Sequence, residues 1–123
     1  MASELRLTTL ANNAGTESVD TTYVINGSAK AWVNYDGATN TAEDSFNVAS
    51  VTDGGTGIFT VNYSSNMSNS TPAIVVTTTD TSFAGISDKS NVSSSSARFE
   101  TDNSASSNRD RNYNGFVAHG DLA

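Results

Sequence analysis

The chain has 123 residues, the length of a single domain, and only 36% of them are hydrophobic and 15% charged. Its net charge of −7 argues against nucleic-acid binding and against attachment to an anionic membrane surface, since both partners attract basic proteins. The sequence has no cysteine, which excludes disulfides and thiolate chemistry, and no apolar run that predicts membrane insertion or a signal peptide.

Residues 1–28 read as an N-terminal arm. The segment ELRLTTL (residues 4–10) places Leu5 and Leu7 on one face, and TTYVINGS (residues 21–28) also alternates, so both segments are predicted to be extended β-structure. Neither carries enough apolar surface for a core of its own. The arm must therefore be covered by the main domain or by a neighbouring chain, and we expect a homo-oligomer.

The next segment, AKAWVNY (residues 29–35), holds the single tryptophan and alternates with period two. Small residues and Tyr35 share one face of the predicted strand, whereas Trp32 shares the other face with polar neighbours. Two interpretations of Trp32 stay open. It is either a half-buried packing residue of the domain or a subunit interface, or a platform on which a ligand stacks.

Residues 45–64 predict a β-hairpin. DSFNVASV forms its first strand, with Phe46 and Val48 on one face and a possible bulge at residues 49–51. TDGGTG is a strong turn signal with three glycines and an aspartate, and IFTVNYS, which contains Phe59, returns as the second strand.

The remaining segments also alternate between short strands and polar loops. AIVVTTTDTSF (residues 73–83) predicts a central strand, ARFETD and FVAHGDLA predict two more, and residues 82–96 and 102–114 are predicted loops. Short strands with frequent turns are typical of antiparallel sandwiches. The predicted fold is therefore all-β, an antiparallel β-sandwich or jelly-roll-like domain over residues 29–123 with the extended arm at 1–28.

Residues for catalysis, metal binding or cofactor binding do not form a recognisable pattern. His119 is the one histidine, and the sequence has no nucleophile elbow, phosphate-binding loop or dinucleotide fingerprint. Glu43 and Asp44 are adjacent, and adjacent strand residues point to opposite faces, which suits a catalytic acid–base pair badly. We therefore predict no enzyme activity, no catalytic or metal site, and no cofactor.

The loop at residues 102–114 is the best candidate for recognition, because binding residues often lie on long loops of a β-scaffold. It combines hydrogen-bond donors and acceptors with an aromatic ring, a set that suits sugar hydroxyls and equally a subunit contact. The candidate receptor-contact residues are Arg109, Asp110, Arg111, Asn112 and Tyr113.

Three stretches resemble a known family: SELRLTTLANNAGTESVDTTYVINGSAKAWVNYDG, then DSFNVASVTDGGTGIFTVNYSSNM, and the terminal GDLA. They are similar to tail-fibre-like virion proteins of tailed bacteriophages, in character those of marine phages. The resemblance covers about residues 3–67 and the last four residues, and residues 73–114 match no family pattern. Fibre subunits are usually longer, with the similar stretch as one module.

The resemblance implies a trimeric, non-enzymatic virion protein, made in the host cytoplasm, with other virion proteins and possible host cell-surface glycans as partners. A capsid head-decoration protein on the same fold, or a small glycan-binding β-module, are the alternatives. The residues predicted to pack within the domain or between subunits are Leu5, Leu7, Trp32, Tyr35, Phe46 and Phe59.

Overall fold

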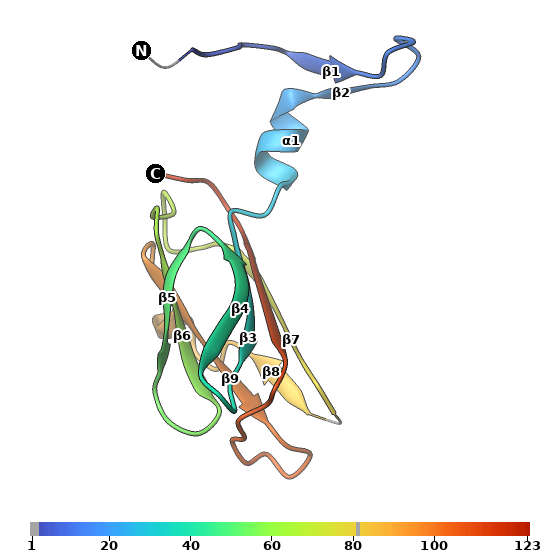
Figure 1. Ribbon diagram of the computed structural model, residues 1–123. Helices are drawn as coiled ribbons and strands as arrows, with labels where there is room; N and C mark the ends of the chain where they lie inside the picture. Colours follow the sequence, from blue (N-terminus) through green and yellow to red (C-terminus); the bar gives the residue numbers. More distant parts are fainter. Residues whose placement is uncertain (1–2, 81) are drawn as a thin grey trace.

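The computed structural model describes residues 3–80 and 82–123 and consists of a β-sandwich with an arm that projects from one end (Figure 1). The predicted all-β antiparallel sandwich is confirmed. The chain's last residues lie near the root of the arm (Figure 1). We call this end of the sandwich the arm end and the opposite end the distal end.

Two four-stranded antiparallel sheets form the sandwich. The first sheet, in the order β4-β3-β10-β7, contains β3 (Ala31–Asp36), β4 (Thr41–Phe46), β7 (Ala73–Thr78) and β10 (Asn114–His119). The second sheet, in the order β5-β6-β9-β8, contains β5 (Val48–Asp53), β6 (Ile58–Tyr63), β8 (Phe83–Gly85) and β9 (Ser96–Asp102). A short 3₁₀ helix, η1 (Lys89–Asn91), lies between β8 and β9.

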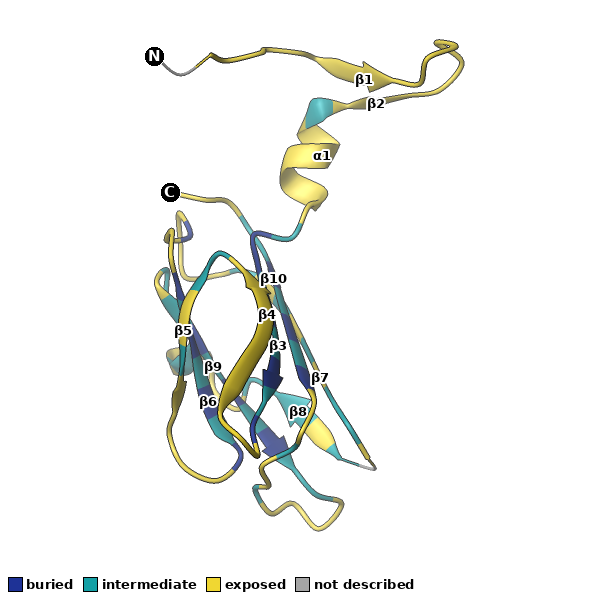
Figure 2. Ribbon diagram, viewed as in Figure 1, coloured by how far each residue is buried: buried dark blue, intermediate teal, exposed yellow. Residues whose placement is uncertain are grey.

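The core lies between the two sheets and comes mainly from the central strands β3, β10, β6 and β9 (Figure 2). A row of aromatic rings crosses it, with centroids separated by 5.1 Å between Tyr35 and Phe59, 5.4 Å between Phe59 and Phe99, and 6.0 Å between Phe99 and Phe116. Such edge-on and tilted pairs add to the free energy gained from burying the rings. The row joins both sheets.

The alternation predicted for residues 29–35 is present in β3. Ala31, Val33 and Tyr35 are buried, whereas Trp32 and Asn34 are only partly covered on the outer face. The predicted hairpin is also present as β5 and β6, with a register shift between Val48 and Ser50 where the sequence predicts a bulge. Period two and a glycine-rich turn were sufficient signals for these elements.

Three details of the sandwich differ from the sequence-based prediction. The predicted loop at residues 82–96 contains β8 and η1. DSFNVASV is not one strand, because Asn47 adopts a left-handed conformation (φ 54°) and separates β4 in the first sheet from β5 in the second. The Asn47 side chain holds this corner, donating to the Lys30 carbonyl at 2.9 Å and the Ser65 carbonyl at 3.0 Å. In addition, β7 is an edge strand and not a central one, since it pairs only with β10.

The arm contains β1 (Thr9–Ala11), β2 (Ser18–Asp20) and a helix, α1 (Thr21–Gly27). The prediction of extended structure for residues 21–28 is therefore wrong. Asp20 caps the helix by accepting a hydrogen bond from the Thr22 amide at 2.7 Å, which also lowers the pKa of the Asp20 carboxyl. Apart from the partly covered Thr21, the described arm residues up to Ser28 are exposed (Figure 2).

The outer edge of the first sheet is formed by β4, whose six residues are all exposed. Its register against β3 shifts between Asn34 and Tyr35, so that Asp44 pairs with Asn34, Ala42 pairs with Tyr35, and Glu43 is the extra residue of a bulge. The Glu43 carboxylate accepts a hydrogen bond from the Asn34 amide at 3.0 Å.

Candidate recognition surface

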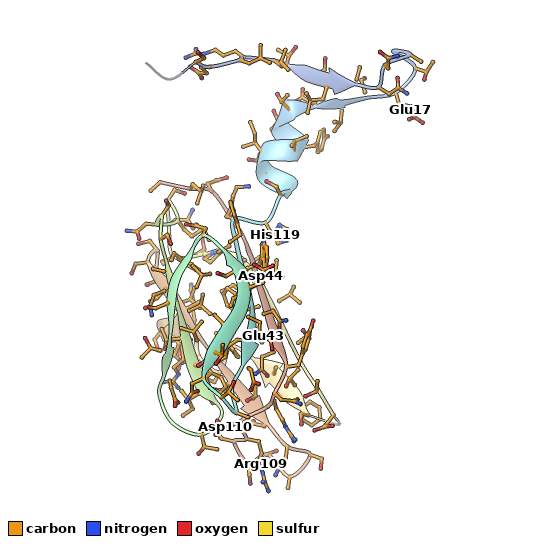
Figure 3. The ribbon with its side chains drawn as sticks, viewed as in Figure 1. Glu17, Glu43, Asp44, Arg109, Asp110 and His119 are labelled. Carbon is orange, nitrogen blue, oxygen red and sulfur yellow. The ribbon has the colours of Figure 1, made fainter. Side chains whose placement is uncertain are left out.

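The candidate recognition residues lie at the distal end, in the connection between β9 and β10 (Figure 3). Three other connections reach the same end: the β3–β4 turn, the β5–β6 turn and the β7–β8 connection (Figure 1). The surface is thus assembled from four segments that are distant in sequence. The sandwich positions all of them through strand ends.

Backbone and side-chain hydrogen bonds attach residues 109–111 to the neighbouring turns. The Asp110 carboxylate accepts from the Gly57 amide at 2.7 Å, and the Arg111 carbonyl accepts from the Gly37 amide at 2.8 Å. Arg111 also forms an ion pair with Asp80 at 2.9 Å. The loop is therefore fixed to three other segments of the distal end.

Two glycines permit this close approach. Gly57 has φ +67°, and a Cβ placed there would lie 2.5 Å from the Thr101 carbonyl oxygen. A Cβ at Gly37 would lie 2.6 Å from the Phe59 ring. The loop can rest on the turns only because neither turn carries a side chain at these positions.

Asn114 joins the loop to the core. Its side chain is fully buried and donates to the Tyr35 carbonyl at 3.1 Å and to the Arg111 carbonyl at 2.9 Å. Its amide oxygen accepts from the Thr78 hydroxyl at 2.8 Å. All of the hydrogen-bonding groups of this buried amide except one lone pair are used, so Asn114 sets the position of the loop relative to β3 and β7.

Of the five candidate residues, Arg109 and Tyr113 present their side chains most freely. Both are exposed, and neither side chain has a hydrogen-bond partner among the described residues. By contrast, Asp110 and Arg111 hold the loop, and Asn112 accepts from the Thr79 hydroxyl at 3.2 Å. The structure thus divides the predicted set into residues that hold the loop and two that point into solvent.

The distal end is acidic. Burial raises the pKa of the Tyr35 phenol, and the negative charges of Asp53, Asp110 and Asp36 raise it further. Arg111 is neutralised by Asp80. Arg109 is therefore the cation of the loop without a carboxylate partner in the described chain, and the surface as a whole does not favour an anionic ligand.

The predicted packing residues separate into two groups. Tyr35 and Phe59 are buried in the core of the sandwich. Leu5, Leu7 and Phe46 are 81%, 47% and 52% exposed, and Trp32 is partly covered on the outer face of β3. No second chain is needed to bury the first group, whereas the chain leaves the second group exposed or only partly covered.

The ionisable residues considered for chemistry do not gather in one place (Figure 3). His119 lies near the arm end, Glu43 and Asp44 lie on β4, and Arg109 and Asp110 lie at the distal end (Figure 3). Among residues 3–80 and 82–123, no group of three histidine or carboxylate side chains is arranged to hold a metal ion, and no helix has the length and apolar character needed to span a membrane.

Four surface depressions, of about 240 to 400 Å³, are lined by residues other than Trp32, Tyr35 or Tyr113. One of about 380 Å³ lies at the open edge between the sheets, beside Ile74, Ile86 and Val92. A stacking site for a sugar around the named aromatic residues is thus not among them. Tyr113 is 49% exposed.

Sequence reasoning missed Asp36, Asp53 and Asp80 as parts of the distal surface. A signal for the first two was present, because each is followed by glycine and each lies shortly after a predicted strand. Strands that pair antiparallel bring such turns to common ends, so the two Asp-Gly pairs could have been placed together. Asp80 had no comparable signal, because residues 73–83 read as one continuous strand.

Comparisons with known proteins add no relationship: no family model, curated protein or solved structure matches this chain.

Proposed function

We propose that the protein is a virion structural component of the tail-fibre or host-adhesion type, and that it acts as an oligomer. The observation that carries the proposal is the division of the molecule into two functional ends. An arm with uncovered apolar side chains extends from one end, and a fixed set of polar loops lies at the other (Figures 1 and 2). The resemblance of residues 3–67 to fibre proteins of tailed phages agrees with this arrangement.

A protein that links a particle to a surface needs an attachment region and a contact region that do not interfere with each other. Here Leu5 of the arm and Tyr113 of the distal loop are exposed at opposite ends of the molecule. The loop is held by Asp110, Arg111 and Asn114, so its backbone needs little ordering when the loop binds a partner.

The contact surface suits neutral hydroxyl groups better than anionic ones. Arg109 offers planar donors, Tyr113 offers a ring face, and the surrounding carboxylates of the acidic end offer acceptors. These groups match the hydroxyls and apolar faces of neutral sugars. We therefore propose an uncharged host glycan as the receptor class.

Electron microscopy of particles labelled with an antibody to this chain tests the assignment to a virion tail. Label at the tail or its fibres is the expected result. Label over the capsid shell would replace the proposal with the head-decoration alternative. Particles that carry no label would rule out both virion functions.

The contact surface is tested with the double variant Arg109→Ala/Tyr113→Ala. These two side chains make no hydrogen bonds within the described chain, so the fold and the oligomer should be unchanged while adsorption to host cells decreases. Thr16→Ala in the arm hairpin is the control for an exposed substitution remote from the distal end. A double variant that assembles and adsorbs like the parent would remove this loop from the receptor site, and one that fails to assemble would make it a subunit contact.

A further inference from the structure

The arm presents an apolar surface that the chain itself leaves uncovered. Leu5, Leu7, Leu10, Val24 and Ile25 line a depression of about 400 Å³ between the first strand segment and α1. These side chains are 42% to 81% exposed. A seven-residue helix without buried residues and a hairpin of three-residue strands are marginal by themselves, so the arm needs a surface to pack against.

The outer face of the first sheet carries a second uncovered apolar surface. Trp32 pairs with Phe46 on one side and Val117 on the other, and Val117 pairs with Val75. Directly paired residues share a face, so these four side chains form one row across all four strands, which we call the outer apolar row. Phe46 and Val75, at its two ends, are 52% and 59% exposed.

The outer face of the second sheet is different. Its paired rows contain Ser50 with Asn62 and Ser96, and Thr52 with Thr60 and Arg98. These side chains are polar, as is usual for the outward residues of an antiparallel sheet that face solvent. That face also carries Ile58 and Phe83, but they pair with Glu100 and Asp102 and form no apolar row, so the outer apolar row is specific to one face of the sandwich.

The junction between arm and sandwich keeps the arm away from its own sheet. Lys30 is 8% exposed, and its ammonium donates to the Ser28 carbonyl at 2.9 Å and also to the Ile25 carbonyl in the last turn of α1. The Asn47 side-chain amide donates a hydrogen bond to the Lys30 carbonyl. Folding the arm back onto the row of the same chain would break these bonds and leave a buried ammonium without acceptors.

The exposed area of the chain also indicates a missing partner. A compact monomer of 12.8 kDa is expected to expose roughly 6,300 Å². This chain exposes 7512 Å². The excess, roughly 1,200 Å², exceeds the ~800 Å² that each partner contributes to a standard protein interface.

We propose that the arm of one copy packs on the outer apolar row of a second copy. Each chain then gives one arm and receives one, so that in a closed ring of copies both apolar surfaces of every chain are covered. The proposal rests on the oligomer in the proposed function, and it holds wherever in a particle the protein lies.

Cross-linking of cysteine variants tests the contact, since the parent has no cysteine. An Ile25→Cys chain with one affinity tag is co-expressed with a Val75→Cys chain with another tag, and the product is treated with a short bismaleimide. We expect a cross-linked product that carries both tags. Ser50→Cys, exposed on the polar outer face of the second sheet, replaces Val75→Cys as the control and should give none.

Three results would overturn the proposal: no mixed product from an assembled protein, equal products with Ser50→Cys and Val75→Cys, or an Ile25→Cys/Val75→Cys double variant that cross-links within one chain at high dilution. A monomer in light scattering, with the parent sequence, would also overturn it. The three cross-linking results can occur whether or not microscopy finds the protein on the tail, so they separate failure of this contact from failure of the proposed function, whereas a monomer would remove the oligomer from both.

A matched pair of phenylalanine variants tests the energetics of the contact. Phe46→Ser removes one end of the outer apolar row, and Phe83→Ser removes a phenylalanine that is 67% exposed on the second sheet. We expect Phe46→Ser to raise the dissociation constant of the oligomer at least tenfold, roughly the effect of unburying one such side chain. Phe83→Ser should leave it unchanged, and equal effects of the two variants would contradict the proposed contact.

Discussion

Replacing Asn114 with aspartate examines how the distal loop is joined to the core. The two side chains have the same shape, so the variant leaves no cavity. Aspartate can still accept from the Thr78 hydroxyl, but it cannot donate to the carbonyl oxygens of Tyr35 and Arg111. The variant therefore changes the hydrogen bonding at one fully buried position and little else.

The size of the effect follows from these contacts. The buried Tyr35 carbonyl and the partly buried Arg111 carbonyl lose the donor at residue 114, although Arg111 keeps its bond from the Gly37 amide, and an unpaired negative charge then faces both carbonyls. We expect the free energy of unfolding to fall by about 3–5 kcal/mol near neutral pH, the usual effect of an uncompensated buried charge. This is a large part of the stability of a domain, about 5–15 kcal/mol.

The penalty depends on pH in a defined direction. Burial and the two carbonyl oxygens favour the protonated carboxyl, so the pKa of the new aspartate is higher in the folded chain than in the unfolded chain, where it is about 3.9. The folded variant binds more protons, and the stability contributed by the protonated form is lost as pH rises through the folded-state pKa. The variant should therefore be closer to the parent at about pH 4 than at about pH 7.

Urea unfolding of variant and parent at both pH values, followed by circular dichroism and by the fluorescence of the single tryptophan, measures this difference. Asn112→Asp is the matched control, because that exposed side chain only accepts a hydrogen bond, and it should change stability by less than about 0.5 kcal/mol. A loss below about 1 kcal/mol for Asn114→Asp, or a loss that is equal at the two pH values, would refute the reasoning.

Three further predictions concern the sandwich. Phe99→Ala opens a cavity in the middle of the aromatic row and should lower the free energy of unfolding by about 3–5 kcal/mol in denaturant titrations; a loss under 1 kcal/mol would mean that the core collapses around it. Gly57→Ala puts a methyl group 2.6 Å from the Arg109 amide at φ +67°, so thermal unfolding should show a loss of at least about 1 kcal/mol, and a neutral effect would contradict the tight turn. Burial raises the pKa of Tyr63 to about 12 from about 10, so this phenol should stay neutral up to that pH and stability should fall between those values. Phenolate absorbance in a pH titration measures it, and ionisation of every tyrosine near pH 10 would disprove the burial of this side chain.

The sequence pattern predicted those strands and turns that depend only on residues close together in the chain. In β3 the period-two alternation placed Tyr35 inside and Trp32 outside, and the glycine-rich turn located the β5–β6 hairpin. Asn47 was not recognised because its role depends on distant groups, the carbonyls of Lys30 and Ser65, which fix the corner where the chain changes sheets. An alternating sequence pattern does not predict where a chain passes from one sheet to the other.

The arm helix and the distal surface also depend on contacts that a local sequence pattern does not reveal. Residues 21–27 contain β-branched residues that favour a strand, but the Asp20 cap at one end and the Lys30 ammonium at the other favour a helix. At the distal end the sequence indicated that a loop lies between the two last strands. It could not show that Asp110 is bonded to Gly57, since that contact depends on how the two sheets are stacked.

The bulged edge strand β4 has a consequence for molecules that are crowded together. An open sheet ends in backbone N–H and C=O groups that can template the addition of another chain, and this is the first step toward fibrillar aggregates. In β4 the bulge at Glu43 breaks the regular spacing of those groups, and a second copy of the strand would bring its own Glu43 and Asp44 against the same two carboxylates. Many copies can therefore be concentrated in one place without pairing through β4 into a continuous sheet.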